Sequence, residues 1–92
     1  MTKAEAIIRT AGLTTLDKAH TETVVTALVV TIMHELECGN AVSIPDFGTF
    51  HPLWRNQTTG RLIRENTTVI VPAHFIPHFE PYSHFKHAIS NR

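Results

Sequence analysis

The stretch that most constrains the fold is residues 41–50, AVSIPDFGTF, near the middle of the chain. Val42 and Ile44 alternate with a serine, which predicts a strand with one buried face. A Pro-Asp pair interrupts that strand, and a second one resumes with Phe-Gly-Thr-Phe. Gly48 stands between two aromatic residues, where a side chain would obstruct a bend or a close approach of backbone. This stretch therefore separates a helical first part from an extended β excursion that returns to the body.

A first helix is predicted at the start of the chain. Thr2 and Glu5 have the spacing of a capping box, in which each side chain satisfies a free backbone N–H. Apolar residues recur on one face of this helix, and Gly12 marks its end.

A second, longer helix follows. Thr14 and Thr15 can cap it, Asp17 is expected in its first turn, and Gly39 is expected directly after its end. Its apolar stripe is too wide for one short neighbouring helix to cover, so it serves either a monomer core or a dimer interface. We favour the dimer, because a chain of 92 residues with a projecting arm has little core of its own. The stripe consists of Val24, Val25, Leu28, Val29, Ile32, Met33 and Leu36.

The part after Phe50 predicts a β-arm and a last helix. Few apolar residues lie between Arg55 and Thr68, so this segment cannot form its own core and should project. Thr59-Gly60 is expected at the turn between its two strands, because glycine readily takes a positive φ. Ser83 can cap a final helix that runs to about Ser90, with Phe85, Ala88 and Ile89 facing inward.

Charge is distributed unevenly along a chain whose formal net charge is zero with histidine neutral. Residues 1–50 carry three basic and six acidic side chains. Residues 51–92 carry five basic and two acidic ones, and five of the seven histidines. A neutral total is unusual for a nucleic-acid binder, because phosphate contacts need lysine and arginine. The positive charge nevertheless lies in the part that includes the predicted arm.

Several other classes of protein are disfavoured. A single cysteine, Cys38, excludes an intramolecular disulfide and a cysteine-cluster zinc site, and fits a reduced, intracellular setting. No apolar run approaches the length of a membrane span, and the N-terminus lacks the apolar segment of a signal peptide. No nucleophile–base pair, paired carboxylates or Gly-rich phosphate loop stands out, so we expect neither an enzyme nor a cofactor.

The order of these features resembles the HU and integration host factor family of bacterial DNA-bending proteins. The residues that carry the likeness are Met1-Thr2-Lys3, Cys38-Gly39, Phe47-Gly48-Thr49-Phe50, Thr59-Gly60-Arg61 and Pro77-His78-Phe79. It covers nearly the whole chain without an evident gap. Phe-Gly-Thr-Phe alone is a weak signal, but its position in a chain of family length, with Pro-x-Phe after the arm, is specific.

The resemblance implies an α+β fold and an intertwined homodimer. Each chain would be one domain, residues 1–92, with a helical base, a three-stranded sheet, a protruding two-stranded β-arm and a short C-terminal helix. Residues 1–39 would form the helical dimerisation part, 40–79 the sheet and the arm (the arm itself at about 52–74), and 80–92 the C-terminal helix. The implied dimer-interface residues are Val25, Leu28, Val29, Ile32, Phe47, Phe50 and Phe79.

The resemblance also implies the surface that binds DNA. In the family the two arms wrap the minor groove, and an Arg-Asn-Pro at each tip places a proline between base pairs. Arg61-Leu62-Ile63 matches that motif, so the arginine is retained and Ile63 replaces the proline. Isoleucine can act as a wedge, although it lacks the rigid ring; alternatively Leu62 and Ile63 are covered by a partner protein or by each other. The implied DNA-binding residues are Lys3, Arg55, Arg61, Ile63, Arg64 and Lys86.

Some positions remain open to two interpretations. The arm arginines either contact DNA or are ordinary solvated charges on an exposed hairpin. Ser83 stands where the family usually has lysine, and Asp46, where it usually has glycine, would repel phosphate. Trp54 can stack on a sugar or base edge, or shield the base of the arm. We therefore expect weaker binding than that of a typical member.

The histidines also allow two interpretations. His84 and His87 are three residues apart on one helix, and His74 and His78 are close in sequence. No cysteine or acidic residue completes a recognisable ligand pattern with them, so we expect no metal site. Protonation of several histidines near pH 6 would instead make the arm part strongly basic.

The sequence thus predicts a homodimer that binds and bends duplex DNA with little sequence preference. We expect it in the cytoplasm, associated with the nucleoid or with a phage, and without a membrane partner. The alternative is a protein-interaction module of the same fold, for example in a phage or larger assembly, with little or no DNA binding. A heterodimer with a more basic paralogue lies between the two.

Overall fold

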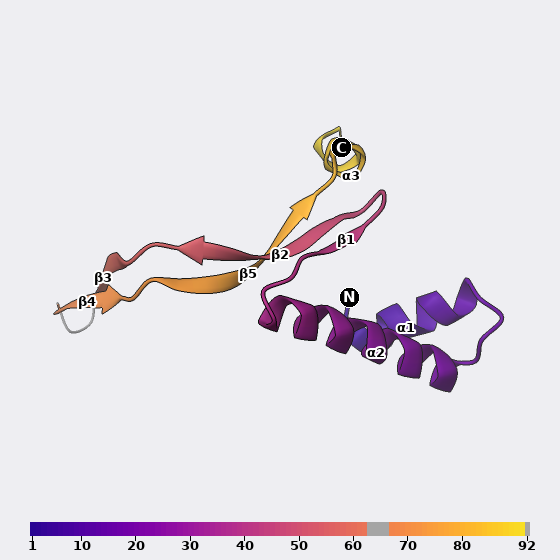
Figure 1. The fold of residues 1–92 in the computed structure, drawn as a ribbon. Coiled ribbons are helices and arrows are strands. Elements are labelled where there is room, and N and C mark those ends of the chain that lie inside the picture. The colour runs from indigo at the N-terminus through magenta and orange to yellow at the C-terminus, as the bar shows by residue number, and fades with distance from the viewer. Residues whose placement is uncertain (63–66, 92) are drawn as a thin grey trace. The chain divides into compact units, whose positions relative to one another are not determined.

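The computed structural model describes the backbone of residues 1–62 and 67–91, with the side chains of all of these except Arg61 and Leu62. The chain forms two compact units, Met1–His34 and Glu35–Arg92. The elements in chain order are α1 (Lys3–Gly12), α2 (Lys18–Glu37), β1 (Val42–Ile44), β2 (Gly48–Arg55), β3 (Thr58–Leu62), β4 (Thr67–Val71), β5 (His74–Pro81) and α3 (Ser83–Ser90) (Figure 1).

The first helix begins after Thr2 and ends at Gly12, as predicted, with the hydroxyl half of the predicted capping box formed. The Thr2 hydroxyl accepts a hydrogen bond from the backbone N–H of Glu5 at 3.3 Å, which satisfies one of the free donors at the start of α1. Gly12 is the last residue of the helix. Ile7, in the middle of α1, is one of the few buried residues in the part of the chain that the structure describes.

The second helix is capped by Asp17, and the prediction that Thr14 or Thr15 caps it was wrong. Asp17 Oδ1 accepts a hydrogen bond from the backbone N–H of His20 at 2.8 Å and lies 2.7 Å from His20 Nδ1. The Thr14 hydroxyl belongs to the preceding turn, where it donates to the Ala11 carbonyl and accepts from the N–H of Leu16. Asp17 directly precedes Lys18, the first helical residue, and therefore occupies the N-cap position.

The end of α2 agrees with the predicted role of Gly39. This residue has a φ of 87°, in the left-handed region that favours glycine. Its N–H donates to the Leu36 carbonyl at 3.0 Å, and the N–H of Asn40 donates to the Glu35 carbonyl at 2.9 Å. These two bonds form a Schellman motif, which satisfies carbonyl groups at the helix end and turns the chain toward β1.

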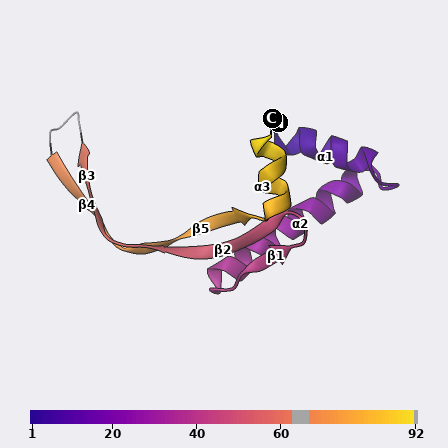
Figure 2. The ribbon, with the colours of Figure 1, turned by 90° about the horizontal axis from the view of Figure 1, so that it is seen from above.

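The strands form the predicted three-stranded sheet and two-stranded arm. The sheet has the order β1-β2-β5 and is antiparallel throughout, and β3 pairs with β4 in the arm. Figures 1 and 2 show that β3 and β4 continue the ribbon of β2 and β5 away from β1 and α3, and that the ribbon curves between the two ladders.

A tight turn joins β1 to β2. The N–H of Phe47 donates to the Ile44 carbonyl at 3.1 Å, with Pro45 and Asp46 at the two central positions. Asp46 has a φ of 64°, the one positive value of a residue other than glycine within residues 1–62 and 67–91. Proline at the first central position and a positive φ at the second are the features of a type II turn.

The register of the ribbon is continuous through the arm. Arg55 opposite His74 is the last pair of the β2–β5 ladder, and Thr58 opposite Val71 is the first pair of the β3–β4 ladder. Two residues on each strand therefore separate the ladders, Asn56-Gln57 and Pro72-Ala73. Since the interruption has equal length on both strands, neither strand slips relative to the other.

The predicted turn at Thr59-Gly60 was wrong. Both residues lie within β3, opposite Ile70 and Val69, and Gly60 does not have a positive φ. The two strands of the arm are connected through residues 63–66, which lie outside the described residues. The threonines and Gly60 form ladder pairs because β4 supplies apolar, β-branched partners opposite them.

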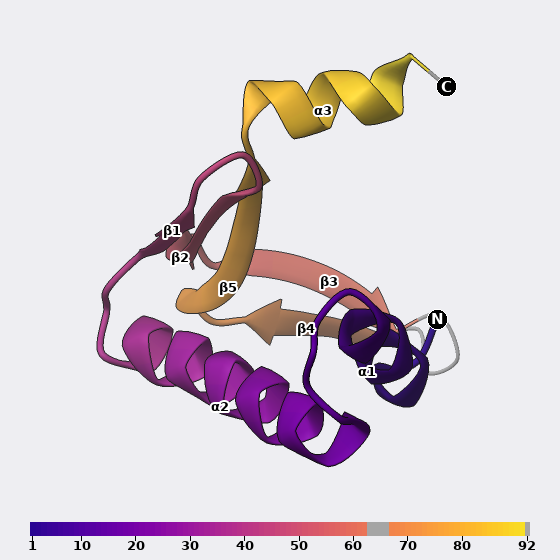
Figure 3. The same ribbon diagram turned by 90° about the vertical axis from the view of Figure 1, so that its right-hand side faces the viewer.

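Four phenylalanines form an aromatic cluster at the base of the ribbon. Ring centroids of Phe47 and Phe79 are 4.8 Å apart, those of Phe50 and Phe79 4.9 Å, and those of Phe47 and Phe85 5.5 Å. Figure 3 shows α3 beginning where β5 ends, near the turn between β1 and β2, and the N–H of Tyr82 donates to the Phe47 carbonyl at 3.0 Å. The cluster therefore joins the sheet to the last helix.

The last helix differs from its prediction in two respects. Its N-cap residue is Tyr82, whose side chain makes no capping hydrogen bond, and Ser83 is already the first helical residue. Of the three side chains expected to face inward, Phe85 is half-buried in the aromatic cluster, whereas Ala88 and Ile89 are exposed. Within the described residues, α3 is therefore packed at its first turn and exposed toward its end.

Much of the apolar surface of α2 is also exposed. Leu28, Val29 and Met33 are each about half exposed. Val25 and Ile32 are half-buried, and Thr21 is buried, with its hydroxyl bonded to the Asp17 carbonyl. A helix with apolar residues on most of its circumference requires burial that this chain does not supply for it.

Gly48 allows the close approach of β2 to β5. A Cβ at this position would lie 2.6 Å from the Glu80 carbonyl oxygen and 2.6 Å from Cε1 of Phe79. Gly48→Ala should therefore destabilise the protein by about 2 kcal/mol or more, because backbone has to shift. Gly60→Ala is the matched control, since its Cβ would meet only Val69 Cγ2, at 3.6 Å, and it should be neutral or slightly stabilising. Urea unfolding at one protein concentration measures the free energy of unfolding of both variants. Equal changes in the two variants would contradict the close approach at Gly48.

The Asp17 cap makes a pH-dependent contribution to stability. The N–H of His20, and after it the His20 ring, hold the pKa of the Asp17 carboxyl below its ordinary value of 3.8. The carboxylate thus stabilises the folded state above that value, and the contribution is lost as the pH falls through the lower, folded-state pKa. Asp17→Ala should lower the melting temperature at pH 7, by an amount that shrinks toward pH 2. Asp17→Asn, which keeps a capping oxygen, should have the smaller effect in the same circular-dichroism melts.

Candidate nucleic-acid interface

The β2–β5 ladder has two chemically different faces. Successive residues of a strand point to opposite sides, so directly opposed pairs share a face with the pairs two residues away. One face, here called the aromatic face, consists of Phe50, Pro52, Trp54, Phe75, Pro77 and Phe79. The other, here called the histidine face, consists of Thr49, His51, Leu53, Arg55, His74, Ile76, His78 and Glu80.

Ring contacts agree with this division. Phe50 lies against Phe79 on the aromatic face, and on the histidine face the rings of His51 and His78 are edge to face with centroids 5.1 Å apart. The aromatic face carries the cluster that Phe85 of α3 completes. The histidine face is therefore the side of the ribbon on which hydrophilic side chains are presented.

The charges of the histidine face are close to balance. Arg55 is exposed at its outer end, directly opposite His74. Glu80 is its only acidic member, with Oε2 3.6 Å from Nε2 of His51. With neutral histidines the one arginine and the one glutamate cancel, so the protonation of three imidazoles decides the sign of this surface.

A hydroxyl network borders the histidine face at the sheet end. The Ser43 hydroxyl on β1 is hydrogen-bonded to the phenol of Tyr82, and the Thr49 hydroxyl lies 3.2 Å from the same oxygen. Hydrogen bonds to its oxygen from Ser43, and next from Thr49, lower the pKa of Tyr82 from its ordinary value of 10.0. The network ties β1, β2 and the start of α3 together.

The effect of this network on the pKa of Tyr82 can be tested by absorbance. Tyr82 is the only tyrosine of the chain, so the absorbance of tyrosinate during an alkaline titration belongs to it alone. Ser43→Ala should raise the pKa of Tyr82 toward 10.0, because a hydroxyl that stabilises the phenolate is lost. Ser90→Ala removes a hydroxyl that donates to the Lys86 carbonyl, outside this network, and should leave the titration unchanged. An unchanged midpoint in Ser43→Ala would contradict the network.

The structure places the predicted DNA-binding residues on several elements. Arg55 is the last residue of β2, and Arg61 lies in β3 opposite Thr68. Lys86 is exposed on α3, and Lys3 is exposed at the first position of α1, in the other unit. Ile63 and Arg64 lie outside the described residues, so the predicted wedge has no structural description.

Trp54 and Phe75 form an exposed pair on the aromatic face. Their ring centroids are 4.9 Å apart, edge to face, yet Trp54 is 52% and Phe75 64% exposed. The indole N–H donates to Asn56 Oδ1 at 3.1 Å, which fixes the ring at the end of the ladder. Trp54 therefore covers Phe75 in part and still presents an open ring surface.

The described part of the chain has neither of two other kinds of site. Across residues 1–62 and 67–91, no three histidine, cysteine, aspartate or glutamate side chains converge where a metal ion could bind. In the same residues no helix combines the length and the apolar composition that crossing a bilayer requires.

Sequence reasoning missed the opposed pair of His51 and His78 and their proximity to Glu80. The signal was present as two alternating segments, His-x-Leu-x-Arg in β2 and His-x-Ile-x-His-x-Glu in β5. Alternation alone places these residues on one side of each strand. Only the register, which depends on the position of the arm turn, brings the two sides together.

Comparison with known proteins identifies the family. The family described as bacterial DNA-binding protein matches residues 1–90. DNA-binding protein HU of Clostridium pasteurianum is 32% identical over 90 residues, which cover 98% of this chain and 99% of that protein. The chain belongs to the HU and integration host factor family. The family recognised from the sequence is thereby confirmed.

Both branches of the HU and integration host factor family are represented among the relatives. Integration host factor subunit beta of Shewanella halifaxensis is 30% identical over 82 residues, covering 88% of this chain and 86% of that one. Among solved structures, HU of Anabaena in a cocrystal with DNA matches with a TM-score of 0.92 and 26% identity over the full length of both chains. The predicted α+β, HU-like fold is confirmed.

Proposed function

We propose that this HU-family protein is a homodimer that binds duplex DNA and bends it, with little sequence preference. The observation that carries the proposal is the match over its full length to an HU chain crystallised with DNA, together with a ribbon that presents Arg55 and three histidines on one face. The mechanism needs no catalytic step and no cofactor.

Dimer formation supplies the burial that the single chain lacks. Val25, Leu28, Val29 and Ile32 of α2 form one apolar surface, and Leu28 and Val29 are about half exposed. Phe47, Phe50 and Phe79 form the other, in the aromatic cluster, with Phe47 still 39% exposed. We assign both surfaces to the dimer interface, because burial of apolar area is the main source of stability for so small a chain.

The proposed DNA contacts come from the ribbon and from two helices. In the proposed complex Arg55 and the histidine face meet phosphates beside the minor groove, and Lys3 and Lys86 hold the flanking backbone. Arg61 and Arg64 enter the groove from the arm, and Ile63 inserts as an apolar wedge. The roles of Ile63 and Arg64 rest on the family likeness alone.

The low charge of the chain sets the strength of binding. The formal net charge of the chain is zero with histidine neutral. Each subunit nevertheless offers five candidate phosphate contacts from permanent cations, which are Lys3, Arg55, Arg61, Arg64 and Lys86. Asp46, at the β1–β2 turn, and Glu80, on the histidine face, repel phosphate. Binding should therefore be weaker than that of strongly basic family members and sensitive to salt.

The cellular role that we propose is DNA compaction or an architectural part in a larger nucleoprotein assembly. We place the protein in the cytoplasm on the bacterial nucleoid, or in a phage-associated complex. The whole chain acts as one DNA-binding domain in this proposal. The competing function is a protein-interaction module, which the exposed Trp54–Phe75 pair and the neutral charge favour.

Titration of a fluorescent duplex of ~30 base pairs tests the proposal. With up to five contacts per subunit, the logarithm of the association constant should fall with the logarithm of salt concentration at a slope of up to about −9 for the dimer. Arg55→Ala with Arg61→Ala removes four contacts per dimer and should flatten that slope by up to about 4.

A matched control removes the same charge elsewhere. Arg9→Ala with Lys18→Ala deletes two cations of the helical unit that have no proposed DNA contact. This variant should keep most of the salt slope. If its slope flattens as much as that of the arm variant, the arm effect reflects the net charge of the chain and not contacts made by the arm. Absence of binding at low salt would overturn DNA binding and favour the protein-interaction module.

A further inference from the structure

Two histidines at the base of the arm are directly opposed. His51 on β2 pairs with His78 on β5, and their rings are in edge-to-face contact with centroids 5.1 Å apart. Both side chains are half-buried, and the next pair but one along the same face is Arg55 opposite His74. Three imidazoles and one guanidinium thus follow one side of the ribbon toward the arm.

The hydrogen bonding of His51 indicates which nitrogen is open to a proton. Nδ1 lies 3.3 Å from the Pro52 carbonyl oxygen, which can only accept, so in the neutral ring Nδ1 carries the hydrogen. Nε2 is then left as an acceptor, and it is buried without a hydrogen-bond partner among the residues that the structure describes. A proton on Nε2 would convert this orphaned acceptor into a donor.

Glu80 is the group that faces that donor. Its Oε2 lies 3.6 Å from His51 Nε2, and its side chain is 72% exposed while that of His51 is 25% exposed. Protonation of His51 therefore creates an ion pair at the edge of solvent, and the carboxylate keeps the freedom to turn away. Glu80 acts as an internal counter-ion that an incoming phosphate would have to displace or tolerate.

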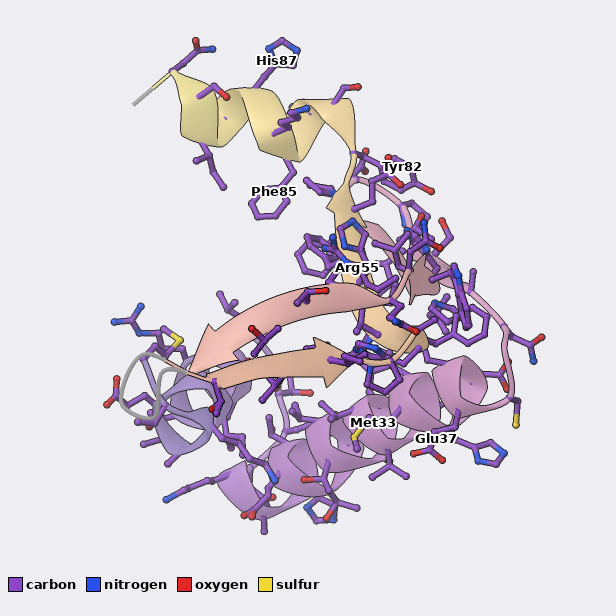
Figure 4. The ribbon with its side chains drawn as sticks, turned by 90° about the vertical axis from the view of Figure 1, so that its left-hand side faces the viewer. Met33, Glu37, Arg55, Tyr82, Phe85 and His87 are labelled. Carbon is purple, nitrogen blue, oxygen red and sulfur yellow. The ribbon has the colours of Figure 1, made fainter. Side chains whose placement is uncertain are left out.

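The other groups around the pair do not change this balance near neutral pH. Across the strands, Thr49 lies opposite Glu80, and β1 contributes the Ser43 hydroxyl on that side. Tyr82 is hydrogen-bonded to Ser43 and Thr49, and Arg55 and His74 complete the titratable and charged groups of the face. On α3, His87 points to the side of the helix opposite Phe85, which packs into the aromatic cluster (Figure 4).

We propose that His51 and His78, with His74 and Arg55, form a phosphate-binding strip for duplex DNA that protonation switches on and Glu80 restrains. The inference rests on the proposed DNA binding and adds to it the regulation of one contact surface. With neutral imidazoles the strip carries Arg55 against Glu80 and no net charge. With protonated imidazoles it gains up to three positive charges per subunit.

DNA binding and protonation are then linked. Phosphate stabilises the protonated imidazoles, so DNA should be bound more tightly at lower pH, and binding at fixed pH should take up protons. Each additional phosphate contact steepens the salt dependence by about 0.9 in the logarithmic slope. A gain in affinity of at least about fivefold between pH 8 and pH 6 is the expected size for two subunits.

Affinity for the fluorescent duplex at pH 8, 7 and 6, at one ionic strength, tests the inference. The wild-type protein should show the gain, His51→Gln with His78→Gln should lose most of it, and Glu80→Gln should bind more tightly than wild type already at pH 8. His84→Gln with His87→Gln is the matched control, because it removes two histidines from α3 and should keep the full gain.

A second readout does not depend on affinity. Calorimetry at pH 7 in buffers of different ionisation enthalpy measures protons taken up when DNA binds. Wild type should take up protons, and the His51→Gln, His78→Gln variant should take up fewer. If that double variant does not fold, as judged by circular dichroism, the single His78→Gln and the Glu80→Gln variants carry the same comparison.

The outcomes separate this inference from the function on which it rests. Salt-dependent binding at pH 8 with no gain at pH 6 would overturn the strip and leave DNA binding in place. A gain that survives in the His51→Gln, His78→Gln variant and disappears in the α3 variant would also overturn it. Absence of binding at every pH and at low salt would overturn both.

Discussion

The pairing of β2 with β5 is the constraint on which the rest of this structure depends. A strand alternates its side chains, so a single register decides which residues share a side. Here it brings all the aromatic rings of the ladder to one side and all its histidines to the other. The ribbon can thus join the hydrophobic interior of a dimer through one surface and meet a polyanion through the other. A slip of β5 by one residue would put its aromatic residues on the side of the β2 histidine and its histidines on the side of the β2 aromatic residues.

Local sequence signals predicted the elements of this chain well, because the residues that carry them act within a few positions. Thr2 and Gly39 mark helix ends, Pro45 marks a turn, and the Phe-Gly-Thr-Phe stretch predicts the strand and the close contact at Gly48. The cap of α2 was misassigned within one turn, because Thr14 has local hydrogen-bonding alternatives that the sequence does not rank.

Long-range register could not be predicted in the same way. A turn at Thr59-Gly60 would place His51 opposite Thr68. His51 would then be paired with neither His78 nor the nearby carboxylate of Glu80. The residues of the arm are mostly polar, so no buried face specifies the register from within, and glycine is an ambiguous signal in a strand. For the candidate site, sequence reasoning therefore gave the composition of the arm and missed which side chains meet.

Asp46 shows how a departure from the family can be tolerated by the fold and still affect the proposed function. Its positive φ explains why glycine is usual at this turn, and aspartate is among the few residues that accept the conformation at modest cost. The backbone is kept and a negative charge is added at the sheet end of the ribbon. In the proposed function this charge and that of Glu80 both oppose phosphate binding.

The prolines of the ribbon have a consequence for molecules crowded on one stretch of DNA. Pro52 and Pro77 are directly opposed, and Pro72 lies in the interruption between the ladders, so both strands lack N–H donors at these points. Beyond β1 the ribbon has two open edges, and such edges ordinarily recruit further strands. Each missing donor disfavours the pairing of a further strand at that position. In the proposed complex this disfavours strand pairing between the ribbons of adjacent dimers on one duplex.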